Sequence, residues 1–225
     1  MDNELKQYVV KTGTTTVGVV CSDGIVLAGD RKVTLGHGDT VVYIATKEDD
    51  KVVPVTDNII VSTAGNASDL QRVVKLIRSE LKLKELRSKQ KTTIKEAANL
   101  FTNIVYQSIR QMSVIVSITH FLLAGYDKEG FYLYEIGADG TLGKVDKYQA
   151  TGSGMVQADP ILDAEYKEGM TTKEGIELVK KCINASRQRD LASGKGIDVF
   201  VVEKEDIKKV LSQEVVSQYE DRITA

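Results

Sequence analysis

The chain has 225 residues, of which 42% are hydrophobic and 28% charged, a composition typical of a soluble globular protein. A formal net charge of −2 gives no indication of a nucleic-acid or anionic membrane partner. The length allows one large domain with a sizeable core, and no repeat or low-complexity linker divides it. We therefore expect a single domain.

The cysteines, the N-terminal segment and the longest apolar run argue against several further classes of protein. Cys21 and Cys182 are isolated and lack CxxC spacing, so no disulfide framework, metal site or cofactor is expected. Residues 1–13 carry Asp2 and Glu4 and no sustained apolar stretch, unlike a signal peptide. The apolar run 112–126 is interrupted by polar residues and is too short to cross a bilayer. The expected location is the cytoplasm.

The first half of the chain predicts strands, then helices. Residues 14–21 and 24–30 are rich in β-branched and apolar residues and flank a Ser-Asp-Gly turn, which predicts a β-hairpin. Residues 51–55 and 58–65 predict a second strand pair. Apolar residues then recur at helical spacing from Ser68 to Leu83 and from Thr93 to Gln111.

The second half of the sequence predicts strands again, followed by a helix and a final strand. Residues 113–127 and 131–137 predict strands around a Lys-Glu-Gly turn, and residues 137–141 predict a further turn. A helix of roughly 18 residues is expected after Thr172, and residues 196–203 predict a final strand. Blocks of strands and helices joined by short turns favour layered antiparallel sheets, an α+β arrangement.

Few residues offer familiar catalytic chemistry. His37 and His120 are the only histidines, which gives little support to a Ser-His-Asp hydrolase, and HExxH and phosphate-binding motifs are absent. The sequence Gly13-Thr-Thr-Thr could simply be an edge strand. A threonine exposed as a new N-terminus would, however, carry its own base, an amine with a pKa of about 7.7 to 8.0. Such a nucleophile needs no histidine.

Six segments, in this order, carry a resemblance to a known family. They are GTTTVG (13–18), LAGDRKVT (27–34), KVVPVTDNI (51–59), STAGNASD (62–69), TGSG (151–154) and RDLASGKGIDV (189–199). With them the chain resembles a β subunit of the 20S proteasome, of archaeal type, in the N-terminal-nucleophile hydrolase superfamily. The resemblance covers nearly the whole chain.

The resemblance implies a four-layer αββα sandwich, with two antiparallel sheets between helical layers, and a threonine endopeptidase activity. Residues 1–13 would be a propeptide removed by self-cleavage between Gly13 and Thr14, and residues 14–225 the catalytic domain. Thr14 would then attack substrate peptide bonds through an acyl-enzyme ester.

The other roles implied by the resemblance fall on named positions. Asp30 and Lys51 would tune proton transfer from the nucleophile. Without the resemblance, the preferred interpretation of these two residues is a structural ion pair. The backbone N–H of Gly65 would form the oxyanion hole. Ser153, Asp190 and Ser193 would hold the threonine amine and the catalytic water; a capped helix end and two turns are the alternative.

The resemblance also implies a primary specificity pocket. Asp49 and Thr63 would make this pocket more polar than usual, so we expect basic side chains to be accepted. The expected lining is Val33, Asp49, Val53, Thr63, Ala67 and Gln71.

Two departures from the family pattern affect these assignments. About five extra residues lie between Asp30 and Lys51, which makes Lys47 a rival for the catalytic lysine. Lys51 is preferred because it immediately precedes the apolar strand Val-Val-Pro-Val. Asp159-Pro160 replaces the usual aromatic-glycine pair in a segment near subunit contacts.

The implied partners are other β subunits in a heptameric ring, α subunits, indirectly an ATPase regulator, and unfolded polypeptide substrates. Neither nucleic acid nor membrane is expected. The alternative is a non-cutting or partner-dependent β subunit that acts as a ring scaffold. A non-catalytic α-type subunit fits poorly, because such chains lack the Gly-Thr step.

Overall fold

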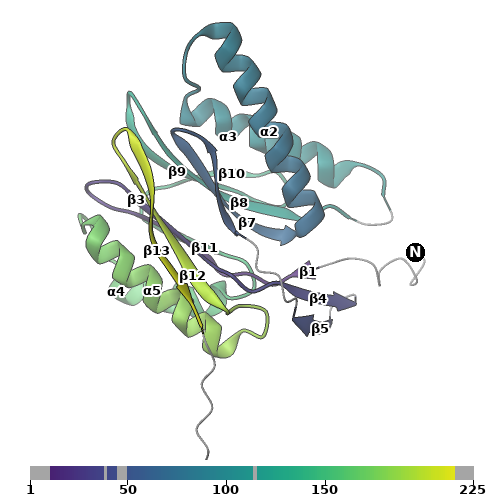
Figure 1. Cartoon of the computed structure of the whole chain (residues 1–225), viewed down its shortest axis with the longest axis vertical. Helices are drawn as coiled ribbons and strands as arrows, with labels where there is room; N and C mark the ends of the chain where they lie inside the picture. Colours follow the sequence, from purple (N-terminus) through teal and green to yellow (C-terminus); the bar gives the residue numbers. More distant parts are fainter. Residues whose placement is uncertain (1–10, 38–39, 45–49, 114–115, 216–225) are drawn as a thin grey trace, which may run out of the picture.

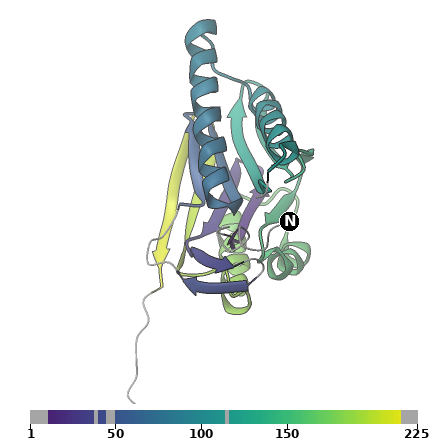
Figure 2. The same cartoon turned by 90° about the vertical axis from the view of Figure 1, so that its right-hand side faces the viewer.

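Two antiparallel sheets lie face to face between two layers of helices (Figure 1). The computed structural model describes residues 11–37, 40–44, 50–113 and 116–215. Helices α2 (Ala67–Ser88) and α3 (Ile94–Arg110) cover one sheet, and α4 (Met155–Glu165) and α5 (Thr172–Arg189) cover the other. Figure 2 shows the same layers from the side. The predicted α+β sandwich is confirmed.

The first sheet is built around β7. Two short strands, β6 and β1, pair with β7 one after the other along its length. The described order is β1-β7-β8-β9-β10, and β6 also pairs with β7. All these pairs are antiparallel. The strands are β1 (Lys11–Thr12), β6 (Val52–Thr56), β7 (Ile59–Asn66), β8 (Thr119–Asp127), β9 (Gly130–Ile136) and β10 (Leu142–Val145).

The second sheet has the order β11-β2-β3-β12-β13, and a separate hairpin projects beside it. Its strands are β11 (Tyr148–Thr151), β2 (Thr16–Val20), β3 (Ile25–Asp30), β12 (Gly196–Glu203) and β13 (Asp206–Glu214). The hairpin consists of β4 (Thr34–His37) and β5 (Thr40–Ile44). It lies between Asp30 and Lys51, in the segment where the resemblance implies extra residues.

Apolar side chains fill each of the three spaces between the four layers. In β7, Ile59 and Val61 pack toward α2 and α3, whereas Ile60 packs toward the second sheet with Leu27. This alternation follows from the two-residue period of a strand. A third cluster, which includes Val179 of α5, joins the second sheet to its helices. Each sheet is therefore covered on both faces.

Side-chain caps fix where two of the helices begin. Thr93 accepts a hydrogen bond from the backbone N–H of Glu96, and the Glu96 carboxylate accepts one from the N–H of Thr93. Thr171 and Glu174 form the same capping box before α5. These reciprocal bonds satisfy backbone donors that the first helical turn leaves unpaired.

The sequence missed several shorter elements. The strand expected at 113–127 begins only at Thr119, and β1, β4, β5, β10, β11, β13 and α4 were not among the predicted elements. These strands are short, bulged or rich in charged residues, so their patterns are weak. Among the residues the structure describes, no helix is long and apolar enough to cross a membrane.

Candidate active site

The three consecutive threonines are buried but have different surroundings. The Thr15 N–H donates to Asp30 Oδ1 at 2.8 Å, and the Thr15 hydroxyl lies 2.7 Å from Ser193 Oγ. The Thr16 hydroxyl pairs with that of Thr151 at 2.6 Å. The backbone N–H of Thr14 donates to Ser153 Oγ at 3.2 Å. The second and third threonines thus hold structural hydrogen bonds, and Thr14 lies just before β2.

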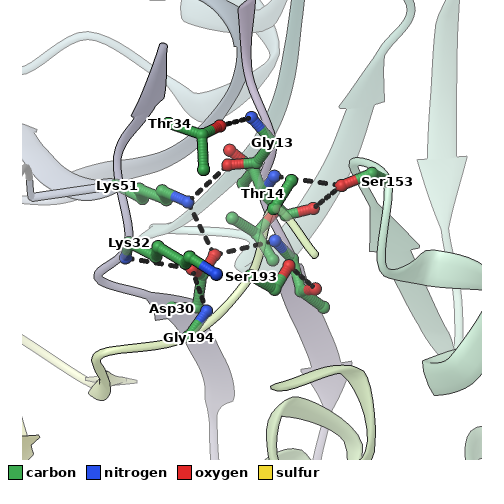
Figure 3. Close-up of polar contacts among 12 residues, drawn as sticks. Gly13, Thr14, Asp30, Lys32, Thr34, Lys51, Ser153, Ser193 and Gly194 are labelled. Carbon is green, nitrogen blue, oxygen red and sulfur yellow. Dashed lines mark hydrogen bonds and ion pairs between the residues drawn. The ribbon is translucent and has the colours of Figure 1, made fainter. Parts of the chain in front are cut away.

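Asp30 and Lys51 form a buried ion pair beside the Gly13–Thr14 peptide bond (Figure 3). Lys51 Nζ donates to Asp30 Oδ1 at 2.7 Å and to the carbonyl oxygen of Gly13 at 2.8 Å. The lysine residue is 6% exposed and the aspartate 1%. A buried ammonium on a carbonyl oxygen polarises that carbonyl, so the arrangement favours attack on this peptide bond.

Backbone amides complete the coordination of the Asp30 carboxylate. Its Oδ2 accepts hydrogen bonds from the N–H groups of Lys32, at 3.1 Å, and Gly194, at 2.9 Å. With Thr15 N–H and Lys51 Nζ on Oδ1, four donors surround the group. These hydrogen bonds hold the Asp30 carboxylate in one orientation, and the carboxylate in turn orients the Lys51 ammonium.

A second polar cluster, from the segments after β11 and α5, also contacts Thr14. Asp190, the C-terminal cap residue of α5, accepts hydrogen bonds on Oδ2 from Ser153 Oγ and Ser193 Oγ, both at 2.6 Å. Because Ser193 donates its proton to Asp190, the Thr15 hydroxyl is the donor toward Ser193. Asp190 thereby orients Ser153, whose oxygen receives the Thr14 N–H.

Two glycines of the site leave no room for a side chain. A Cβ at Gly13 would collide with the Cβ of Ala192, and one at Gly65 would collide with the carbonyl of Ile118. Gly65 also has a φ of +131°, a conformation open mainly to glycine. These positions therefore need glycine for steric reasons.

The segment before Gly13 lies along the edge of the first sheet as an added strand. Thr12 pairs with Gly65 and Lys11 with Asn66, antiparallel to β7. The Gly13 N–H donates to Thr34 Oγ1 at 3.2 Å. Peptides commonly bind proteins by adding a strand to an exposed edge in this way. The same edge can accept an extended peptide.

A pocket of about 140 Å³ opens beside Thr14, between β6, β7 and α2. Five of the six residues expected to line it do so; Asp49 lies outside the described residues, as does the rival lysine Lys47. The pocket also contains residues that the sequence did not single out, including two cations. The expected members are Val33, Val53, Thr63, Ala67 and Gln71, and the added ones are Asp50, Leu70, Val74, Lys75 and Arg78.

The sequence analysis also missed Thr34 and Lys32. Thr34 binds Gly13, and the ammonium of Lys32 donates to the carbonyl oxygen of Leu191, joining β3 to the loop after α5. Both residues sit in the quoted segment LAGDRKVT, but a single sequence gives no signal that separates them from ordinary loop residues. Their roles follow from contacts more than twenty residues away.

The remaining titratable candidates lie apart from Thr14. Burial raises the pKa of the Cys21 and Cys182 thiols to about 12, so neither is a nucleophile near neutral pH. His120 lines a neighbouring cavity, and its Nε2 lies 2.8 Å from Glu135 Oε1. His37 belongs to β4. Neither thiol therefore competes with Thr14 as a candidate nucleophile.

Two antiparallel sheets between helical layers, with a threonine at the start of a central strand, define the N-terminal-nucleophile hydrolase fold. A family model described as "Proteasome subunit" matches residues 10–202. The chain therefore belongs to the proteasome subunit family.

Several relatives carry the name of a β-type subunit. "Proteasome subunit beta" of Methanosarcina thermophila is 38% identical over 97% of this chain and 98% of its own. The protein of that name from Archaeoglobus profundus is 37% identical over 94% and 98%, and that of Nanoarchaeum equitans 33% over 88% and 96%. The chain is thus a proteolytic subunit of the proteasome core, a peptidase that assembles with other subunits.

Proposed function

We propose that this subunit is an N-terminal threonine endopeptidase whose nucleophile, Thr14, is released by self-cleavage of the Gly13–Thr14 bond. The observation that carries the proposal is the contact of Lys51 Nζ with both the Gly13 carbonyl oxygen and Asp30. A polarised carbonyl directly before a buried threonine supplies the electrophile and the nucleophile of one acyl shift.

Self-cleavage proceeds through an ester. The Thr14 hydroxyl oxygen attacks the Gly13 carbonyl carbon, and the Lys51–Asp30 pair mediates the movement of the hydroxyl proton. The C–N bond then breaks, the Thr14 nitrogen receives a proton, and the Gly13 acyl group remains on the threonine oxygen. Water hydrolyses this ester, which releases residues 1–13 and leaves a free threonine amine.

Peptide hydrolysis reuses the same groups. The freed Thr14 amine, with an ordinary pKa of about 7.7 to 8.0, accepts the hydroxyl proton while Oγ attacks the substrate carbonyl. The substrate lies where Lys11 and Thr12 now pair with β7, and the Gly65 N–H stabilises the oxyanion. Ser153, Asp190 and Ser193 hold the amine and the hydrolytic water.

The pocket beside Thr14 takes the side chain before the cut bond. Its wall is apolar, with Val33, Val53, Ala67 and Leu70, and Lys75 and Arg78 lie along the same face of α2. The expected acceptance of basic side chains rested on Asp49 and Thr63; Thr63 lines the pocket, and Asp49 lies outside the described residues. We propose instead that leucine-like side chains are cut faster than arginine, because the exposed cations Lys75 and Arg78 at the pocket repel a further cation.

The finer assembly is part of the proposal. We infer a heptameric β ring stacked on its twin and capped by α rings, with unfolded polypeptides delivered by an ATPase in the cytoplasm. The intact set of Thr14, Asp30 and Lys51 supports a cutting subunit over the ring scaffold.

The test is hydrolysis of a fluorogenic peptide with leucine before the reporter, by particles co-assembled with α subunits. Thr14→Ala should reduce hydrolysis to background, and Thr14→Ser should retain it because the hydroxyl remains. The matched control is Thr141→Ala, since the Thr141 hydroxyl donates to Asp139 within an exposed turn. Activity that persists in Thr14→Ala would overturn the proposal.

A further inference from the structure

We propose that a buried hydrogen bond between Ser62 and Thr16, which joins the two sheets, sets the distance between the Thr14 hydroxyl and the carbonyl that it attacks. Ser62 and Thr16 are positioning residues, which act through the strands that carry them and take no part in the chemistry. The inference rests on the proposed function of Thr14 and adds two residues that the cleavage mechanism above does not use.

The Gly13–Thr14 bond lies where the chain crosses from one sheet to the other. Thr12 belongs to β1, which pairs with β7 of the first sheet, whereas β2 belongs to the second sheet. The carbonyl oxygen of Gly13 is bound by Lys51, directly before β6 of the first sheet. Thr14 donates its N–H to Ser153, in the segment after β11 of the second sheet. The spacing of the sheets at this edge therefore enters the geometry of the attack.

Three hydroxyls meet between the sheets, two residues along the chain from Thr14. Ser62 Oγ, on β7, donates to Thr16 Oγ1, at the start of β2, at 3.0 Å. Thr16 Oγ1 also lies 2.6 Å from Oγ1 of Thr151, its register partner at the end of β11. Ser62, Thr16 and Thr151 are all 0% exposed, so water does not compete for these bonds. The first bond joins the two sheets, and the second lies within one sheet.

The space between the sheets is otherwise lined by apolar side chains at this point. Val52 and Leu122, the register partners of Ser62 on β6 and β8, belong to the apolar cluster between the sheets. Apolar packing has no preferred direction, whereas a hydrogen bond fixes the distance and angle between its two groups. The spacing of β7 and β2 here is therefore set by the Ser62–Thr16 bond.

The same bond lies beside the lysine of the site. A Cβ at Gly29 would lie 3.4 Å from Thr16 Cγ2 and 3.3 Å from Lys51 Cβ, so both side chains pack over this glycine. The carbonyl oxygen of Lys51 accepts the N–H of Thr63, the neighbour of Ser62, at 2.8 Å. A shift of β7 relative to β2 would therefore also move the lysine that binds the scissile carbonyl.

The test compares Ser62→Ala with Thr151→Val in particles co-assembled with α subunits. Ser62→Ala removes the bond between the sheets and leaves the Thr16–Thr151 bond. Thr151→Val removes an equally buried hydroxyl and leaves the Ser62–Thr16 bond, so it is the matched control.

Two readouts separate positioning from stability. Mass spectrometry follows the first-order rate constant for removal of residues 1–13 in assembled particles, and kcat and KM for the leucine peptide are measured per processed subunit. Neither readout depends on how many particles assemble, so a variant that is merely less stable leaves them unchanged.

Ser62→Ala should lower both the self-cleavage rate constant and kcat about tenfold with KM unchanged, because a misplacement of about 1 Å can cost about 100-fold. Thr16→Val, which removes the same bond from its other end, should lower them at least as much. Thr151→Val, and Thr16→Ser, which keeps the hydroxyl, should stay within about twofold of the unmodified particle.

Unchanged constants in Ser62→Ala and Thr16→Val, or an equal fall in Thr151→Val, would overturn the inference alone. A rise in KM with kcat unchanged in Ser62→Ala would also overturn it, because that result indicates weaker binding and not a misplaced nucleophile. If the unmodified particle neither removes residues 1–13 nor cuts the peptide, the threonine mechanism fails and this inference fails with it.

Discussion

Replacing Asp30 should damage the protein more than replacing Lys51, although the two form one ion pair. In Lys51→Met the Asp30 carboxylate loses its cation but keeps three backbone N–H donors, from Thr15, Lys32 and Gly194. In Asp30→Asn the Lys51 ammonium stays buried and loses the charge of Asp30. The asparagine side chain also presents its NH2 group, a donor, to backbone N–H groups that donated to Asp30 Oδ2.

The contacts give a magnitude for each change. Breaking a buried ion pair costs about 3–5 kcal/mol, and we expect Lys51→Met near the lower end because the amides still stabilise the carboxylate. Asp30→Asn adds two unsatisfied N–H groups, those of Lys32 and Gly194, at about 1–3 kcal/mol each. The expected loss in the free energy of unfolding for Asp30→Asn is therefore about 5 kcal/mol or more, which approaches the whole stability of a typical domain.

The assay is urea unfolding of the full chain, followed by circular dichroism, with every variant carrying Thr14→Ala to prevent processing. Asp30→Asn should unfold at a lower midpoint than Lys51→Met. Glu177→Gln is the control, because the exposed Glu177–Lys180 pair contributes less than about 1 kcal/mol. Equal midpoints for the two site variants, or a lower one for Lys51→Met, would refute this account of the coordination.

Three further predictions concern other parts of the molecule. Gly65→Ala should abolish removal of residues 1–13, since its Cβ collides with Ile118; a processed chain in a gel assay would contradict this. Cys21 and Cys182, with pKa values raised to about 12 by burial, should resist iodoacetamide at pH 8 until urea unfolds the chain, and alkylation of the folded protein would count against their burial. Hydrogen bonds from Lys84 and then Thr93 lower the pKa of Glu96 to about 2, so Glu96→Gln should cost about 1 kcal/mol or less at pH 7. That difference should shrink as the pH falls from about 4.5 toward 2, because protonation removes the favoured carboxylate; a constant difference in urea midpoints would contradict it.

The elements with a strong period could be predicted from sequence. The apolar residues of α2 and α3 recur at helical spacing, and β2 and β3 combine β-branched residues with a clear turn. The hairpin β4–β5 could not, because the glycines and charged residues around it in the sequence resemble a loop. Strand β13 was missed because its lysines and exposed face hide the two-residue alternation.

The residues of the site also fall into those that the sequence predicts and those that it does not. Family motifs in the sequence predicted the residues that the structure brings together around Thr14, from Asp30 to Ser193. They did not predict Thr34 or His120, whose partners come from distant segments, or Lys75, which lines the pocket. A contact that depends on register and packing leaves no local pattern in one sequence. The catalytic roles of all these residues remain predictions.

The most direct test of the central claim is the intact mass of this subunit, alone and after assembly with its α partner, beside a Thr14→Ala control. We predict that the assembled chain loses residues 1–13, that its new N-terminus is Thr14, and that the control keeps its full mass. A full-length mass within assembled particles, or an equal loss in the control, would contradict self-cleavage by Thr14.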